Sequence, residues 1–204
     1  HGEAAVSFLS RLIEQDDASA SHYVELGARF LELARFDEAD KAFQDAVNKA
    51  NSLTEVAQEV KVVCEEVGQL RRLERFYVGL LAMASNNKEI ARMLGSLRLH
   101  LGDLEGAEQA FTRFLAKGAR GHLKVAQAYA KHGEFSRALN HYKRAWEQPA
   151  PGESSLPLEE LALWLEAHGK SDLLAWFVGL HVRRAREPAK AALEASVAFE
   201  RIGY

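Results

Sequence analysis

The chain has 204 residues, 48% of them hydrophobic, and a formal net charge of −3. This composition supports a sizeable folded core and argues against disorder over most of the length. The slightly acidic balance gives no general attraction to nucleic acid, and the apolar runs are too short to predict a membrane-spanning helix.

Helices are predicted along the whole chain, most of them in pairs. Residues 3–17 are expected to form a lone helix, with Ala5, Leu9 and Leu12 on one face. Five helix pairs are predicted to follow, over residues 20–53, 54–87, 88–118, 119–152 and 155–188. Residues 189–204 are expected to form a terminal or capping helix.

Two sequence patterns recur at the same period and define these pairs. Glycines suited to a left-handed helix end stand at intervals of 34, 31, 36 and 34 residues: Gly68, Gly102, Gly133, Gly169 and Gly203. Shortly after the predicted turns, a triplet with a central aromatic recurs: Ala39–Phe43–Ala46, Leu73–Tyr77–Leu80, Ala107–Phe111–Phe114, Ala138–Tyr142–Ala145 and Leu173–Phe177–Leu180. Five occurrences at one period indicate a helical repeat rather than an accident of composition.

The best-fitting repeat is the first. Residues 20–53 carry Tyr23, Leu26, Gly27 and Phe30 on the first helix and Ala39, Phe43 and Ala46 on the second. With these residues the sequence resembles the tetratricopeptide repeat family, whose pattern is W-x2-L-G-x2-Y followed by A-x3-F over about 34 residues. The resemblance covers nearly the whole chain. Two residues depart from the pattern: Ala34 replaces a turn glycine, and Arg98 stands where an aromatic is usual.

The resemblance implies an all-α fold, a right-handed α-solenoid of antiparallel helix hairpins with about five hairpins and a lone helix at each end. It also implies a single domain over residues 1–204. Because the first helix has no partner, we expect the chain to be a multi-repeat segment of a larger protein. The repeat of residues 88–118 is three residues short, around residues 117–121, which predicts a local change in superhelical pitch.

Motifs for catalysis or metal binding are absent from the sequence. It has no H-E-x-x-H, C-x-x-C, G-x-S-x-G or G-x-x-x-x-G-K-[ST] pattern, and the eight histidines show no recognised ligand spacing. His132 and His168 precede turn glycines, where a histidine complements the helix dipole. Cys64 and Trp164 are interpreted as core residues. We therefore expect no enzymatic activity, no cofactor and no metal site.

In the family, the first helices line a concave surface and present the ligand-binding positions. The corresponding residues, which we predict to bind a partner, are Glu25, Glu32, Gln58, Glu59, Val62, Arg92, Met93, Ser96, Lys124, Gln127 and Lys131. The predicted groove is acidic, then basic, then acidic, which suits a ligand of alternating charge; an ordinary solvated face is the plainer interpretation. No repeat has the Lys and Asn pair of the family's carboxylate clamp, so binding of chaperone tails is disfavoured.

The leading functional hypothesis is a scaffold or adaptor that binds a peptide or folded protein in the concave groove. One alternative is a regulatory or substrate-recruiting module of a larger enzyme. Another, RNA binding, is disfavoured because residues 54–67 carry four glutamates against one lysine. Self-association through the solenoid ends is a further hypothesis. The composition leans toward a cytoplasmic location and leaves the periplasm and other compartments open.

Overall fold

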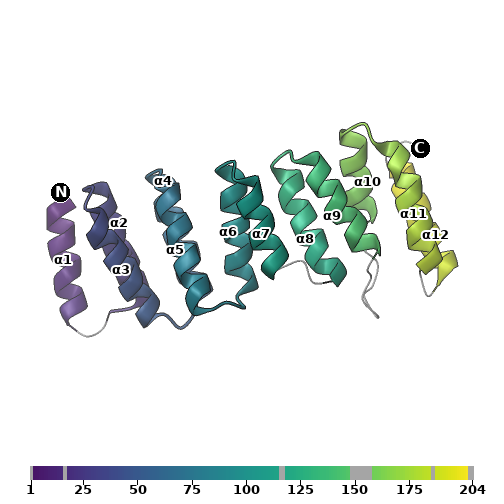
Figure 1. Ribbon diagram of the computed structural model, residues 1–204. Helices are drawn as coiled ribbons and strands as arrows, with labels where there is room; N and C mark the ends of the chain where they lie inside the picture. Colours follow the sequence, from purple (N-terminus) through teal and green to yellow (C-terminus); the bar gives the residue numbers. More distant parts are fainter. Residues whose placement is uncertain (1, 16–17, 115–117, 148–157, 185–186, 202–204) are drawn as a thin grey trace. The chain divides into compact units, whose positions relative to one another are not determined.

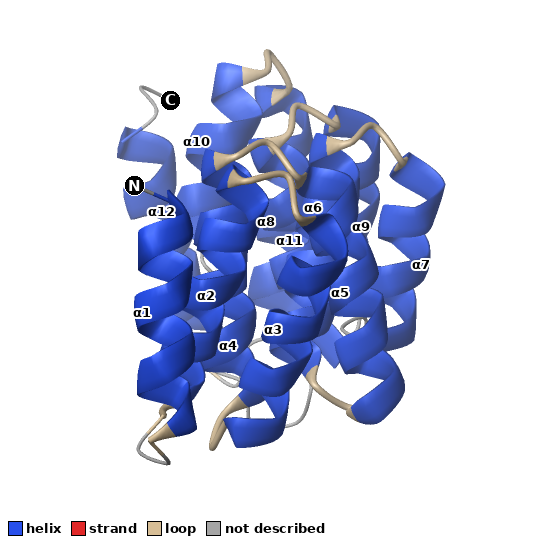
Figure 2. Ribbon diagram, turned by 90° about the vertical axis from the view of Figure 1, so that its left-hand side faces the viewer, coloured by secondary structure: helices blue, strands red, loops and turns tan. Residues whose placement is uncertain are grey.

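The computed structural model describes residues 2–15, 18–114, 118–147, 158–184 and 187–201. Within these ranges the chain is helical and contains no strand (Figures 1 and 2). The helices are α1 Gly2–Glu14, α2 Ala20–Glu32, α3 Phe36–Lys49, α4 Leu53–Glu66, α5 Leu70–Met83, α6 Lys88–His100, α7 Leu104–Phe114, α8 Gly118–Lys131, α9 Phe135–Glu147, α10 Leu158–Ala167, α11 Leu174–Arg184 and α12 Pro188–Arg201, with a short 3₁₀ helix η1 Ser171–Leu173 before α11. The predicted all-α fold built from helix pairs is confirmed.

The helices form two compact units, residues 1–114 (unit 1) and residues 115–204 (unit 2). In unit 1, α1 packs on α2, and the pairs α2–α3, α4–α5 and α6–α7 follow one another. The first helices of these pairs also pack on one another, α2 on α4 and α4 on α6. We call the exposed side of α2, α4 and α6 the first-helix face, and the exposed side of α3, α5 and α7 the second-helix face.

Unit 2 begins with the tightly packed α8–α9 pair. Helix α10 then packs against α11, α9 also contacts α11, and α12 lies against both α10 and α11. The exposed side of the first helices α8 and α10 is the first-helix face of this unit. The predicted change of pitch falls on a join that includes residues 115–117, which lie outside the described residues, so it stays a prediction.

Every hairpin turn ends its first helix in the same way. The turn residue has a positive φ in all five hairpins: Ala34 56°, Gly68 69°, Gly102 76°, Gly133 75° and Gly169 62°. The following residue donates its backbone N–H to a carbonyl five residues earlier, as from Arg35 to Phe30 (2.8 Å) and from Glu134 to Tyr129 (3.0 Å). Ala34 therefore adopts the left-handed turn that glycine forms elsewhere in the chain.

Small residues allow the two helices of a pair to approach closely. A Cβ atom added at Gly27 would lie 2.4 Å from the Phe43 ring, and one added at Gly95 would lie 2.2 Å from the Phe111 ring. Neither distance leaves room for a side chain, and both phenylalanines are almost completely buried. In the α4–α5 pair the Tyr77 hydroxyl donates to the Ala57 carbonyl across the same contact (3.4 Å).

Of the two residues interpreted as core residues, Cys64 lies in the core and Trp164 is half-buried. Cys64 is fully buried, and burial raises the pKa of its thiol from 9.0 to about 12. The Trp164 ring stacks on Phe135, with centroids 4.8 Å apart. His168 bonds through Nδ1 to the Trp164 carbonyl (2.7 Å), one turn before the end of its helix, as expected of a histidine at a helix C-terminus.

Candidate functional site

The first-helix face of unit 1 begins on α2, where the charges are mostly balanced. Arg29 lies between two of the predicted contact residues and forms ion pairs with both Glu25 and Glu32. All three side chains are at least one-third exposed, so these pairs contribute little to stability. The two carboxylates and the one guanidinium together give this stretch of helix a net charge of −1.

Helix α4 carries the most acidic part of this face and an exposed apolar residue. Val62 is 53% exposed, and Gln58 one turn before it is exposed as well. Glu59 accepts a hydrogen bond from the Ser21 hydroxyl of α2 (3.1 Å), which ties the two first helices together at their surface. Here the predicted contact residues form an open surface with an aliphatic side chain among polar and acidic ones.

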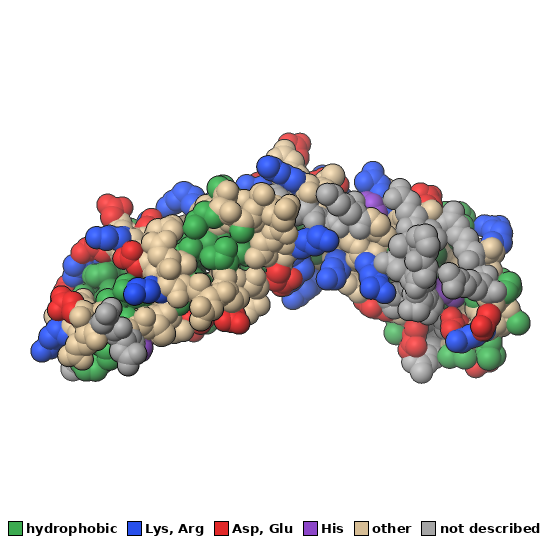
Figure 3. Space-filling view, turned by 90° about the horizontal axis from the view of Figure 1, so that it is seen from below, with side chains coloured by type: hydrophobic (Ala, Val, Ile, Leu, Met, Phe, Trp, Pro, Cys, Tyr) green, Lys and Arg blue, Asp and Glu red, His purple; other side chains and the backbone are tan. Residues whose placement is uncertain are grey.

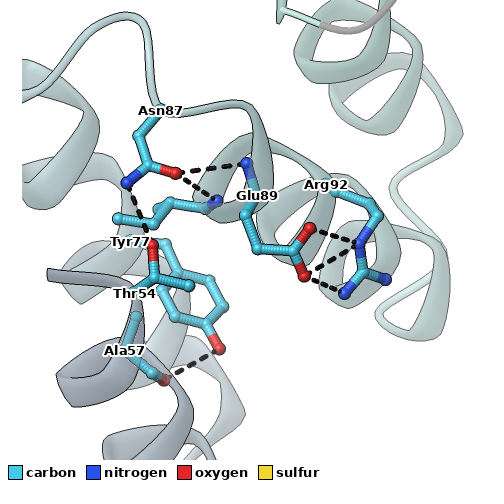
Figure 4. Close-up of polar contacts among 7 residues, drawn as sticks. Thr54, Ala57, Tyr77, Asn87, Glu89 and Arg92 are labelled. Carbon is cyan, nitrogen blue, oxygen red and sulfur yellow. Dashed lines mark hydrogen bonds and ion pairs between the residues drawn. The ribbon is translucent and has the colours of Figure 1, made fainter. Parts of the chain in front are cut away.

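Helix α6 is held in place at its start by Asn87 (Figure 4). The Asn87 side-chain oxygen accepts from the backbone N–H groups of Glu89 and Ile90 (3.1 Å each), and its amide donates to the Thr54 hydroxyl (3.1 Å). One amide therefore caps α6 and joins it to the first turn of α4. The sequence analysis did not single out Asn87, although an Asn before a predicted helix start is a capping signal.

Arg92 on α6 forms an ion pair with Glu89, three residues before it. Its Nε lies 3.1 Å from both carboxylate oxygens of Glu89, and hydrogen bonding to that carboxylate raises the pKa of Arg92 (Figure 4). Ser96, one turn further along, is half-buried. On this helix, the basic part of the predicted groove therefore consists of one arginine, and that arginine is ion-paired with a glutamate.

The expectation that Met93 lies on the open face is wrong. Its side chain is 6% exposed and belongs to the core of unit 1. The reason is that α6 packs against α4, α5 and α7, so its buried surface is wider than one apolar stripe. Met93 is therefore a packing residue.

The first-helix face of unit 2 has a different chemistry. Lys124 and Lys131 are exposed on α8, and the Gln127 amide between them donates to the Glu160 carboxylate on α10 (2.9 Å). Leu163, one turn after Glu160, is 46% exposed. Two lysines, a bridging amide–carboxylate pair and an exposed leucine thus lie on this face.

The predicted contact residues fall into two groups, one on each unit. Acidic and basic side chains are interspersed at the α1–α3 end of unit 1, at the left of Figure 3, in agreement with the ion pairs on α2. In the ranges that the structure describes, no three His, Cys, Asp or Glu side chains gather as a metal ion would require. No described helix is both long enough and apolar enough to cross a membrane.

The repeated left-handed turns and the Gly–aromatic contacts between paired helices decide the type of repeat. They occur at the positions where the sequence pattern expects them, in hairpins about 34 residues apart. The repeats are tetratricopeptide-like.

Comparison with known proteins gives matches among solved structures alone. No protein-family model matches the chain, and no curated protein matches it. A structure of MamA (MSR-1, C2) is 20% identical, with 72% of this chain and 86% of that chain covered and a TM-score of 0.39. A crystal structure of MamA is 14% identical, with 72% and 87% covered and a TM-score of 0.43. A tetratricopeptide repeat protein from Parabacteroides merdae ATCC 43184 is 16% identical, with 100% and 87% covered and a TM-score of 0.46.

Proposed function

We propose that this tetratricopeptide-like chain is a scaffold or adaptor that binds a peptide or folded protein on the first-helix faces of its units. The observation that carries this proposal is the exposure of Val62 on α4 amid Gln58 and Glu59. Single exposed apolar side chains are common on protein surfaces, so what singles Val62 out is that the family resemblance places it at a ligand-binding position, among polar and acidic side chains. The packed helix pairs beneath Val62 hold this surface in place before a ligand binds, which lowers the entropic cost of binding.

The partner's chemistry follows from the two faces. Around Val62 the α4 face is acidic, and it favours a basic segment with an aliphatic side chain. The α8 face with Lys124 and Lys131 favours acidic groups, and the exposed Leu163 beside it offers a second apolar contact. Each unit therefore favours a ligand segment whose charge is opposite to that of its own first-helix face.

The test is quantitative affinity capture with the whole 204-residue chain and two charge-reversal variants. The first variant reverses Arg92, Lys124 and Lys131 to Glu on the first helices. Its matched control reverses Lys41, Lys49 and Arg144 to Glu, three exposed residues on the second helices α3 and α9. Both variants change the net charge equally, so a difference between them reports the face and not the overall charge.

We expect the first variant to lose at least about tenfold in captured partner and the control to keep wild-type capture. Val62→Asp removes the exposed aliphatic side chain from the acidic α4 face, so this variant should also capture less partner in the same assay. Full capture by the first variant and by Val62→Asp would contradict the proposal. Capture of single-stranded RNA, with a steep loss between low and high salt, would favour nucleic-acid binding instead.

A further inference from the structure

A pair of buried histidines joins the two helices of the first hairpin in unit 2. His122 of α8 is 6% exposed, and His141 of α9 is 1% exposed. Their Nδ1 atoms lie 3.0 Å apart, and their ring centroids lie 5.2 Å apart. Two groups that ordinarily titrate near pH 6.5 are therefore in hydrogen-bond contact inside a helix pair.

The helix pairs of unit 1 have no histidines at the corresponding positions. His122 stands 11 residues before the turn residue Gly133, and His141 stands eight residues after it. Counted in the same way from the turn residues of unit 1, the corresponding pairs are Tyr23 and Ala42, Ala57 and Phe76, and Ala91 and Ala110. Since those hairpins pack without an imidazole, the fold does not require a histidine pair at this contact.

The hydrogen bond between the two rings limits how many protons the folded pair can hold. In the neutral pair, one Nδ1 atom carries the hydrogen and the other accepts it. A first proton, added at Nε2 of the donor ring, leaves this bond in place. A second proton must go to the accepting Nδ1, and two N–H groups then face each other across 3.0 Å. The folded pair therefore takes up one proton at most, whatever groups the Nε2 atoms meet.

We propose that the His122–His141 pair is an acid-sensitive contact that weakens the α8–α9 hairpin as the pH falls below about 6.5. In the unfolded chain both histidines take up a proton in this range, whereas the folded pair takes up one at most. Unfolding therefore binds protons, and the stability that the pair contributes is lost as the pH falls. Because unit 1 has no such pair at the corresponding positions, this acid effect belongs to unit 2.

Neighbouring groups of unit 2 do not account for such a pH dependence. The titratable and charged groups around the pair are Tyr129 of α8, Arg137 of α9, and Glu160 and His168 of α10. Tyr129 stacks on the His141 ring with centroids 5.7 Å apart, and the Arg137 guanidinium lies 6.0 Å from the Tyr129 centroid. Helix α10 contacts α9 through Trp164 against Tyr142, and α11 contacts it through Phe177 against Trp146. Tyrosine and arginine stay protonated throughout the range in which histidine titrates.

The consequence for binding rests on the proposed function. Lys124, Gln127 and Lys131 of the first-helix face lie on α8, and α9 is the helix that packs most extensively on α8. Weakening of this hairpin in acid therefore removes the preformed surface of unit 2 on which a ligand would bind. The stability test needs no partner, so the acid-sensitive contact and the proposed function can fail separately.

The test is urea unfolding of the whole chain at about pH 6 and about pH 5, followed by tryptophan fluorescence. All three tryptophans belong to unit 2, so the signal reports on that unit. The double variant His122→Ala/His141→Phe carries the side chains that Ala57 and Phe76 place in the α4–α5 pair, and it has no imidazole at this contact. Between the two pH values we expect the unfolding constant to rise at least about fivefold more in the wild type than in this variant.

A control variant and a measurement on the wild type accompany this comparison. His168→Gln removes an exposed histidine of the same unit and should keep the pH dependence of the wild type. Nitrogen NMR of the imidazoles does not depend on a variant that folds well. At about pH 8 it should show one ring of the pair with its hydrogen on Nδ1 and the other with its hydrogen on Nε2.

Equal pH dependence of the wild type and the double variant overturns the proposal. So does a folded state at about pH 5 in which both rings carry both hydrogens and the α8–α9 pair is intact. A pH dependence that His168→Gln reduces as much as the double variant does overturns the assignment to this pair.

Discussion

The Nδ1 atoms of His122 and His141 lie 3.0 Å apart inside the α8–α9 pair of unit 2. Both side chains are buried, and the His141 ring stacks on Tyr129 with centroids 5.7 Å apart. Since neutral imidazole carries one N–H, one Nδ1 must donate and the other accept. The pair is therefore a tautomer-specific hydrogen bond that joins the two helices.

Replacing the members of this pair singly and together by Phe should give a measurable coupling. We expect each single variant to lose about 1 to 3 kcal/mol of unfolding free energy, because a buried polar partner is removed. The double variant should lose less than the sum, by about 0.5 to 3 kcal/mol, in urea unfolding followed by circular dichroism. Additive losses would show that the two rings do not depend on each other.

Ala34 should be improved by glycine, because its φ of 56° is unfavourable for any residue with a Cβ atom. Ala34→Gly is expected to raise the unfolding free energy by about 1 kcal/mol, measured by urea unfolding. Gly68 has the same turn conformation, with φ of 69°, so Gly68→Ala should lose a similar amount. Stabilisation by both substitutions, or by neither, would contradict the assignment of strain to Ala34.

Two helical glycines should respond to alanine in opposite directions. At Gly95 the new methyl would meet the Phe111 ring at 2.2 Å, so overpacking should cost about 1 to 3 kcal/mol. At Gly79, exposed on α5, nothing lies within 4 Å of the added Cβ, and better helix propensity should gain about 0.5 to 1 kcal/mol. Thermal unfolding of the two variants measures this difference. Equal changes of the same sign would mean that the close approach at Gly95 does not constrain the pair.

The helix pairs could be predicted from the sequence because their signals are local and periodic. Left-handed turns need a glycine or a tolerated substitute, and close helix contacts need a small residue opposite an aromatic, as at Gly27 and Phe43. Each requirement fixes a residue type at a fixed spacing. That residues 1–204 form one continuous array stays a prediction, because the two units are separate compact bodies.

The candidate site was harder to predict because it depends on contacts between repeats. Exposure of Met93 was expected from its position in the helix, but the neighbours of α6 cover it. Arg98 was noted as a departure from the usual aromatic, yet its partner Glu74 lies in the preceding repeat. Only the packed structure shows that Arg98 bonds both to Glu74 of α5 and to the Gly106 carbonyl of α7.

Cys64 should make the chain sensitive to alkaline pH. Burial raises the pKa of its thiol from 9.0 to about 12, so above pH 9 the thiol ionises in the unfolded chain before it ionises in the folded one. Its contribution to stability is therefore complete below about pH 9 and is lost as the pH rises toward 12. In that interval each pH unit should remove up to about 1.4 kcal/mol.

The measurement is the unfolding free energy in urea at pH 8 to about 10.5, for the wild type and for Cys64→Val. Val fills the buried position without an ionisable group, so its free energy should fall less steeply with pH. Burial also raises the pKa of Tyr77, and that residue is present in both proteins. The difference between the two curves therefore isolates the thiol, and parallel curves would show that Cys64 ionises as readily in the folded chain as in the unfolded one.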